Sequence, residues 1–334
     1  MFESRFFHSS LAAIALSSLA LSSCSGAATV PASSTALQQH IQGQSTQIGS
    51  AARGRNPAAL YVSDFYGKSV FRYVRNPGGS LQTPAGSSLV LSYNPGPIAI
   101  GSGGDLYVTD EENESVEVYR KGATGYEQPI RTLLLPFVPS SVAVNRAGNE
   151  FVGGFTNGYV AVYAPGASGS ANTIQRIALP DRHPDINGVA VDSSGDLYVS
   201  DSNEVSEFST PTTSPTLERA IVGSGQQNSP TGLAPNDATG ELYVANAGDN
   251  NILAYSPSAN GTSGPDRTIS SQNPPLIGPV AVAVHGSVLY STSGNSFKGP
   301  ASVFVLDAAK ARQKPAQVVS GPYLADPIGL ALGP

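Results

Sequence analysis

The chain has 334 residues and a formal net charge of −6; only 13% of its residues are charged, whereas Gly (36) and Pro (26) are frequent. This composition favours many short strands joined by turns over a helical protein. No cluster of basic residues occurs, which excludes nucleic acids and anionic membrane surfaces as expected partners, because both require concentrated Lys and Arg.

Residues 1–24 have the pattern of a secretion signal. Arg5 lies in a short polar start, and residues 11–21 form an apolar stretch shorter than the ~20 residues that span a bilayer. The stretch ends in Leu21-Ser-Ser-Cys24, which resembles the bacterial lipobox, and Cys24 is the only cysteine. The resemblance implies a lipid anchor on Cys24; the alternative is an ordinary signal peptide that contains a cysteine. Ser25 resembles the outer-membrane sorting pattern, so we expect a lipid-anchored protein of the bacterial cell envelope.

Residues 25–56 are rich in Ser, Ala, Thr, Gln and Gly. Such a segment has little apolar surface to bury, so we expect it to be a flexible tether. We assign the folded domain to residues 57–334.

A short motif returns roughly every 46 residues along this domain, within the range of periods typical of repeat proteins. The copies are Leu60-Tyr-Val-Ser-Asp64, Leu106-Tyr-Val-Thr-Asp110, Phe151-Val-Gly-Gly154, Leu197-Tyr-Val-Ser-Asp201, Leu242-Tyr-Val-Ala-Asn246 and Leu289-Tyr-Ser-Thr-Ser293. Each copy is the second of four strand signals separated by turn residues. Six such units predict an all-β, six-bladed β-propeller of four-stranded antiparallel blades.

The strand signals change in character along each unit. The first strand consists of small apolar residues, as at Val142–Val144 and Val280–Val284, because blades crowd at the central axis. The third strand alternates with period two, as in Ser115-Val-Glu-Val-Tyr119, so we expect it to be partly solvated near the rim. The domain starts on a second strand at Leu60 and finishes on a first strand at residues 327–332. The C-terminal strand should therefore complete the first blade and close the ring.

The unit resembles the NHL-type propeller repeat over residues 58–334. The best copies are residues 187–201 and 240–255, and the second also resembles the shorter YVTN repeat. The resemblance implies a fold but no activity, because this fold carries unrelated functions.

Two loop classes share one face of a propeller: the turns between second and third strands and the connections between blades. This loop face and the channel mouth are where we expect a ligand. The candidates at the ends of second strands are Asp64, Asp110, Asp201 and Asn246. An acidic ring could hold a divalent cation, whereas Asp and Asn in turns ordinarily accept hydrogen bonds from nearby backbone N–H groups.

The connection between residues 180 and 187 is a dense polar stretch. Its Asp181, His183, Asp185 and Asn187 could supply a general base or ligands, or could simply belong to a solvated loop. We interpret His285 as structural or exposed. The acidic run Glu111, Glu112 and Glu114 is typical of a solvated loop.

The gluconolactonase and regucalcin family is similar in fold and binds a divalent metal through a Glu, an Asn and an Asp at the channel mouth. Asn187, in Ile186-Asn-Gly188, matches the family Asn, but Thr231 stands where the family has Asp. No Glu is evident at the start of the first blade, where Asp326 is the nearest carboxylate. The chain also has no Trp, unlike the Leu-Trp-Phe-Thr-Glu strands typical of virginiamycin-type lyases.

We therefore predict a monomeric, non-catalytic propeller without a cofactor that binds a protein, peptide or glycan on its loop face. The main alternative is a metal-dependent lactonase-like hydrolase using Asn187, Asp185, Asp201 and Asp326. A third interpretation is an envelope scaffold whose role is oligomerisation.

Overall fold

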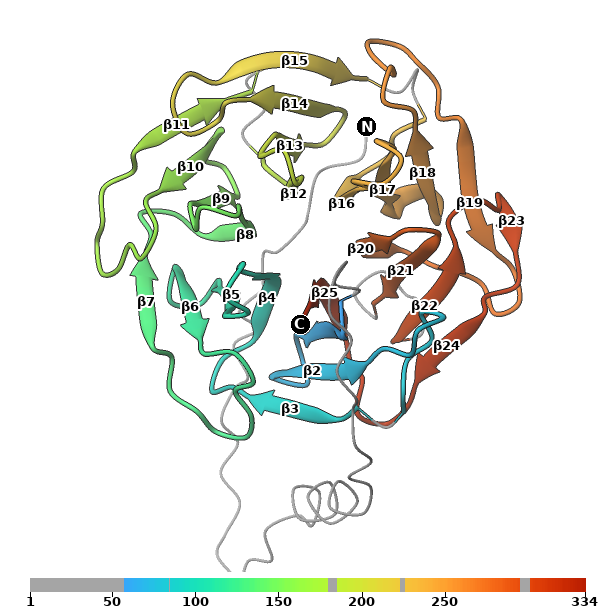
Figure 1. Cartoon of the computed structure of the whole chain (residues 1–334), viewed down its shortest axis with the longest axis horizontal. Helices are drawn as coiled ribbons and strands as arrows, with labels where there is room; N and C mark the ends of the chain where they lie inside the picture. Colours follow the sequence, from blue (N-terminus) through green and yellow to red (C-terminus); the bar gives the residue numbers. More distant parts are fainter. Residues whose placement is uncertain (1–56, 84, 180–184, 223–225, 295–300) are drawn as a thin grey trace, which may run out of the picture. The chain divides into compact units, whose positions relative to one another are not determined.

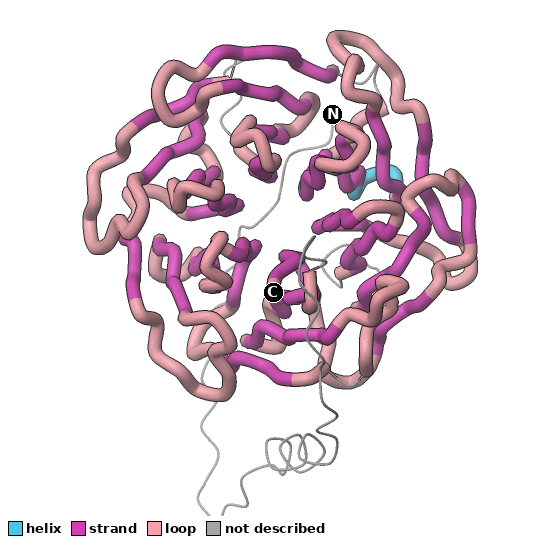
Figure 2. Tube along the Cα trace, viewed as in Figure 1, coloured by secondary structure: helices cyan, strands magenta, loops and turns pink. Residues whose placement is uncertain are grey.

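The computed structural model describes residues 57–334 except 84, 180–184, 223–225 and 295–300. The proposed signal peptide, Cys24, the tether, Asp181 and His183 lie outside these residues. In the described part, six antiparallel sheets are arranged around a central axis, and the only helical element is the 3₁₀ turn η2 (Ala247–Asp249) (Figures 1 and 2). The predicted all-β, six-bladed propeller is confirmed.

Each blade, numbered I to VI along the chain, runs from an innermost strand to the rim. The innermost strands are β25 (Pro327–Gly333), β4 (Pro95–Ile100), β8 (Pro139–Val144), β12 (Gly188–Val191), β16 (Pro230–Pro235) and β20 (Pro279–His285). The second strands are β1 (Ala59–Asp64), β5 (Leu106–Asp110), β9 (Glu150–Gly154), β13 (Leu197–Ser200), β17 (Leu242–Asn246) and β21 (Val288–Ser293).

The outer half of each blade is built in the same way. The third strands are β2 (Ser69–Val74), β6 (Ser115–Tyr119), β10 (Tyr159–Tyr163), β14 (Val205–Ser209), β18 (Asn251–Tyr255) and β22 (Ser302–Asp307). The fourth strands are β3 (Ser87–Val90), β7 (Arg131–Leu134), β11 (Gln175–Ala178), β15 (Thr216–Ile221), β19 (Arg267–Ser271) and β24 (Gln317–Ser320). The sheet of blade V gains a fifth strand, β23 (Arg312–Gln313), which comes from blade VI and pairs parallel with β19.

The ring is closed by a strand from each end of the domain. β25 pairs antiparallel with β1, from Ala59 opposite Gly333 to Asp64 opposite Pro327. Blade I therefore consists of the C-terminal strand and the first three strands of the domain, as the sequence predicted. Figure 1 shows β25, at the red end of the chain, in the same blade as the blue β2, with β1 between them.

The hydrophobic core is divided into six clusters, each between two neighbouring blades. Between blades VI and I, for example, Tyr290 and Val303 pack with Leu60, Val62 and Phe71. The third strands contribute to these clusters and are buried almost throughout, as β6 and β22 illustrate. The expectation that third strands are partly solvated is therefore wrong: both faces of a blade remain covered as far out as the third strand, and exposure begins at the fourth.

Candidate functional site

The polar side chains that end the second strands are almost completely buried and serve their own turns. The Asp110 carboxylate accepts hydrogen bonds from the backbone N–H groups of Glu112 (3.0 Å) and Asn113 (3.1 Å) and from the Asn113 amide (2.7 Å). Asp201 accepts from the backbone N–H groups of Asn203 (2.7 Å) and Glu204 (2.9 Å). These hydrogen bonds are the ones expected of Asp side chains that cap turns.

Asn246 belongs to the same set. Its amide donates to the Gln226 carbonyl (3.0 Å), and its oxygen accepts from the Asn228 N–H (2.6 Å). The four sequence candidates at these strand ends thus lie one per blade, in blades I, II, IV and V, and each supports the turn or connection beside it.

Asp64 has the additional role of holding the closing strand. Its carboxylate oxygens accept hydrogen bonds from the backbone N–H groups of Ala325 and Asp326, both at 2.7 Å, and from that of Gly67 at 3.1 Å. Burial raises the pKa of Asp64, although the three N–H groups act against this. The Phe65 N–H donates to the Asp326 carbonyl (2.9 Å), so two loops from the ends of the domain are joined here.

Asn187 connects two blades. Its amide nitrogen donates to the carbonyls of Asp201 (2.9 Å) in its own blade and Pro230 (3.1 Å) in blade V. Asp185 accepts a hydrogen bond from the Thr156 N–H (3.2 Å) in blade III. The described part of the polar connection is therefore tied to the neighbouring blades. Asp326 directly precedes β25 in blade I, and the strands of blade I lie across the ring from those of blade IV (Figure 1).

Small hydroxyl residues hold neighbouring blades together around the channel. The Ser63, Ser200 and Thr231 hydroxyls donate to carbonyls of the next blade at Gly96 (2.8 Å), Thr231 (2.7 Å) and Val280 (2.8 Å). The close approach of neighbouring blades explains why residue 188 is a glycine: a Cβ at this position would lie 2.2 Å from the Thr231 carbonyl oxygen. Thr231, the residue in the place of the family Asp, thus has a structural contact.

Among the described residues, no group of three or more His, Cys, Asp or Glu side chains could hold a metal ion. The lactonase-like alternative would draw on Asp185, Asn187, Asp201 and Asp326, and none of these residues takes part in such a group. In the part of the chain that the structure describes, no helical segment has the length and apolar composition of a membrane span.

Two sequence interpretations need a correction or a closer definition. Glu112 and Glu114 are exposed, as a solvated loop requires, but Glu111 is half-buried. Burial, followed by the charges of Asp110 and Glu112, raises the pKa of Glu111 to about 7. His285 is also half-buried, and burial together with the nearby Arg75 lowers its pKa.

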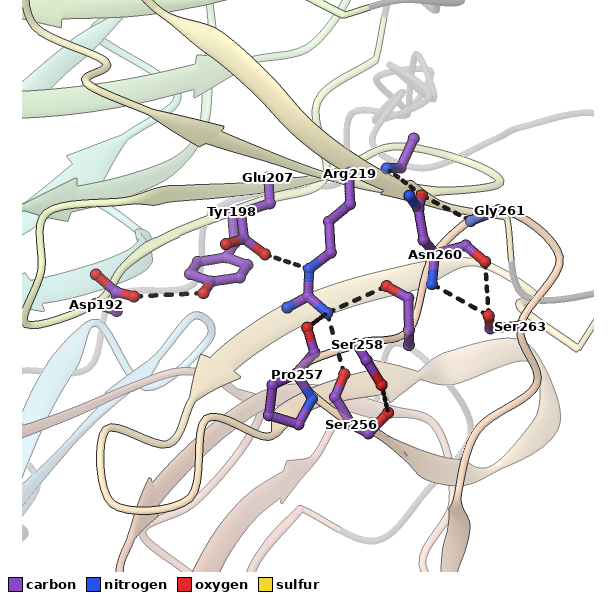
Figure 3. Close-up of polar contacts among 12 residues, drawn as sticks. Asp192, Tyr198, Glu207, Arg219, Ser256, Pro257, Ser258, Asn260, Gly261 and Ser263 are labelled. Atoms are coloured by element: carbon purple, nitrogen blue, oxygen red, sulfur yellow. Dashed lines mark hydrogen bonds and ion pairs between the residues drawn. The ribbon is translucent and has the colours of Figure 1, made fainter.

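Sequence reasoning missed the arginines of the fourth strands, which recur at the rim. The Arg219 guanidinium pairs with Glu207 and donates to the carbonyls of Ser256 (3.0 Å), Pro257 (2.8 Å) and Ala259 (3.1 Å) in the next blade (Figure 3). Arg131 and Arg267 make the same kind of contact with the carbonyls of Ala167 and Ala308. The signal was available as an Arg in most fourth strands, but its partners are defined only by the fold.

The loop face carries two exposed aromatic side chains at the closure of the ring. Tyr66, in the β1–β2 turn, is 62% exposed and Tyr323, in the connection to β25, is 51% exposed. Phe65 contacts Tyr66 edge to face at 5.1 Å between ring centroids, and the Phe65 N–H holds the second loop through the Asp326 carbonyl. Both tyrosines are thus exposed on loops that this hydrogen bond joins, and we call this region the Tyr66 and Tyr323 surface; a sugar or an apolar side chain could pack there.

No protein-family model matches the chain, and no curated protein is significantly similar to it. Solved structures do match. A chain of the nidogen/laminin complex has a TM-score of 0.66 at 16% identity, with 83% of this chain and 98% of that chain covered. A protein of unknown function from Bacteroides caccae reaches 0.58 at 11% identity, covering 83% and 98%. A streptogramin B lyase reaches 0.53 at 13% identity, covering 84% and 89%. At such identities the likeness establishes the fold, and the chain is a distant structural relative of other β-propellers.

Proposed function

We propose that this chain is a lipid-anchored binding protein of the bacterial cell envelope, a monomer whose loop face binds a protein, peptide or glycan without catalysis. The observation that carries the proposal is the exposed pair Tyr66 and Tyr323. The buried Asp64 carboxylate, at the end of the strand that leads into the Tyr66 turn, is engaged by the backbone N–H groups of Ala325 and Asp326, which favours a packing surface over a catalytic group at this part of the face.

The loop-face part of the proposal is tested by replacing both tyrosines. The full chain carrying Tyr66→Ala and Tyr323→Ala should retain less material from envelope extracts and from envelope glycans than the wild type. The matched control is Ile174→Ala with Leu217→Ala, which removes two exposed apolar side chains at the rim, from the segment that leads into β11 and from β15. Equal retention by the wild type and the tyrosine double variant would contradict binding at this surface.

The lipid anchor is tested separately by metabolic labelling with an alkyne fatty acid. The wild type should be labelled and Cys24→Ala should not, and equal labelling of both would reject lipidation at this residue. Light scattering of the purified protein should give the mass of one chain.

The metal-dependent alternative is tested by measuring the melting temperature with added divalent cations. A divalent cation that binds the native state raises the melting temperature through preferential stabilisation. We expect no rise with Ca²⁺, Mg²⁺, Mn²⁺ or Zn²⁺. A rise with one metal that disappears in Asn187→Ala would favour the lactonase-like hydrolase.

A further inference from the structure

A cavity of about 230 Å³ lies between blades I and II, near the rim. Its walls come from the end of β3 and the connection that follows it, from the end of β5 and the turn into β6, from β6, and from β7 with the segment that leads into it. The side chains that matter for its chemistry are Tyr93, Tyr119, Tyr126, Asp110, Glu117 and Glu127. It is separate from the Tyr66 and Tyr323 surface, which lies at the closure of blade I.

The electrostatic character of the cavity is negative. Asp110 and Glu117 are buried in its wall, and none of the described residues that line it is a Lys, Arg or His. Arg120, a cation close to its edge, is itself mostly exposed and is paired with Glu127 at 3.4 Å. Burial raises the pKa of Tyr119 to about 12; the hydrogen bond with Tyr93 acts against this, and the charges of Glu117 and Asp110 add to it, so this phenol stays neutral. The cavity therefore favours a positively charged occupant.

Three tyrosines also line the cavity. The Tyr93 and Tyr119 hydroxyls meet at 3.3 Å inside the interface between the blades, which fixes both rings. Tyr126 is 81% exposed and stands at the mouth of the cavity. Aromatic faces attract organic cations through the ring quadrupole.

The carboxylate oxygens are better suited to an organic cation than to a metal ion. Asp110 is occupied by three hydrogen bonds from its own turn, and Glu117 accepts from the hydroxyls of Ser115 (3.1 Å) and Thr132 (2.6 Å). A metal ion would require these oxygens as inner ligands. An alkylammonium or guanidinium group needs only charge, apolar contact and a few hydrogen bonds.

We propose that this cavity binds a small organic cation, an alkylammonium or alkylguanidinium group of the size of a Lys or Arg side chain. The volume of the cavity limits the size of the ligand, because pockets that hold drug-sized ligands are larger, at about 300–1,000 Å³. The group is carried either by a free amine or by a basic peptide side chain. The proposal is independent of the loop-face function, since the two sites are formed by different side chains.

Calorimetric titration of the full chain with butylammonium, butylguanidinium and neutral pentanol tests the proposal. Both cations should bind, and pentanol should not. Glu117→Gln should weaken cation binding by at least about tenfold, and Tyr126→Ala by about threefold, as expected for loss of an exposed cation–π contact. Titration with acetyl-lysine amide carrying a free side-chain amine identifies the peptide source if it binds more tightly than butylammonium.

Matched controls keep the result interpretable. Glu204→Gln removes a carboxylate that is 9% exposed, as Glu117 is, and that is also bonded to a serine, but in blade IV. Ile174→Ala removes an exposed apolar side chain elsewhere on the rim. Both should bind the cations like the wild type. Tyr126 is exposed, so Tyr126→Ala tests the site even if Glu117→Gln fails to fold. Binding of pentanol equal to that of the cations, or unchanged cation binding in both site variants, would overturn the proposal.

Discussion

Glu150 is the residue that departs most from the repeat. It occupies the position where other second strands have an apolar residue such as Leu60 or Leu197, and it is fully buried. The Arg131 guanidinium from the preceding blade lies 2.7 Å from its carboxylate. Burial raises the pKa of Glu150, and Arg131 acts in the opposite direction. A buried ion pair of this kind need not stabilise the fold, but each partner compensates the buried charge of the other.

Removing one partner of this pair should therefore lower the free energy of unfolding more than removing both. Arg131→Met leaves the Glu150 charge uncompensated and should lower the free energy of unfolding by about 3–5 kcal/mol. The double variant Arg131→Met with Glu150→Leu should recover most of that loss. Denaturant unfolding of the wild type, both single variants and the double variant measures the coupling. A double variant as unstable as Arg131→Met alone would show that the pair is not the reason for the loss.

Glu111 makes stability depend on pH. Its pKa in the folded protein is about 7, above the ordinary value of 4.5, so the folded state binds more protons than the unfolded state between these values. The contribution of Glu111 to the free energy of unfolding is therefore lost as the pH rises through that window. Glu111→Gln should be more stable than the wild type at pH 8, and the difference should shrink towards pH 4.

Denaturant unfolding at pH 4, 6 and 8 checks this expectation. Glu114→Gln, an exposed residue of the same turn, is the control and should show a smaller pH-dependent difference. A difference between Glu111→Gln and the wild type that does not vary with pH would contradict the raised pKa.

At the scale of elements, the outer strand of one blade pairs with the turn of the next. Gly125, Gly169 and Gly261 form parallel bridges to Leu89, Leu133 and Ile221 of the preceding blades. All three glycines have positive φ. β19 and β23 make the corresponding contact between blades V and VI. Between blades VI and I, the Gln317 side chain replaces the backbone by bonding the N–H (2.7 Å) and carbonyl (2.8 Å) of Leu81.

Replacing one of these glycines tests the conformational requirement. Gly169 has φ +56°, and the position that a Cβ would occupy lies in open space, so the cost of Gly169→Ala is that of a left-handed residue alone, about 1 kcal/mol. Gly78→Ala, also in open space but without a positive φ, is the control and should be close to neutral. Thermal or denaturant unfolding distinguishes the two, and equal effects would contradict a role for the left-handed turn.

The sequence predicted strand order well because the second strands are buried on both faces, which leaves continuous apolar runs such as residues 60–62 and 106–108. It did not predict the rim bridges, because they join backbone segments that are remote in the chain. A signal existed in the recurring Gly-Ala-Thr-Gly125, Gly-Ala-Ser-Gly169 and Ser-Ala-Asn-Gly261. The cavity could not be predicted, since Tyr93 and Tyr119 meet only when blades I and II pack together.

At the scale of the whole molecule, stability depends on joining the two ends of the domain. β25 contributes the innermost strand of blade I, and Leu330 belongs to the apolar cluster between blades VI and I. Asp64 binds the residues that lead into this strand. Without β25, β1 would present an unpaired edge beside the channel.

Deletion of residues 326–334 should therefore give insoluble protein or a much lower melting temperature. Asp64→Ala should act in the same direction but more weakly, because it removes the acceptor for the backbone N–H groups that lead into β25 and leaves the strand in place. A melting curve of the soluble fraction measures both. A soluble deletion variant that melts like the wild type would reject the dependence on closure.

The pairing of Ala59 with Gly333 also means that the two ends of the domain are direct neighbours across one ladder of hydrogen bonds. A short peptide could join them, and the chain could then be opened at another turn, such as the one between β14 and β15, without changing any blade. Such a circular permutant would keep every interface between blades. The order in which the blades are synthesised is therefore separable from the ring that they form, and the attachment point of residues 1–56 could be moved to any blade.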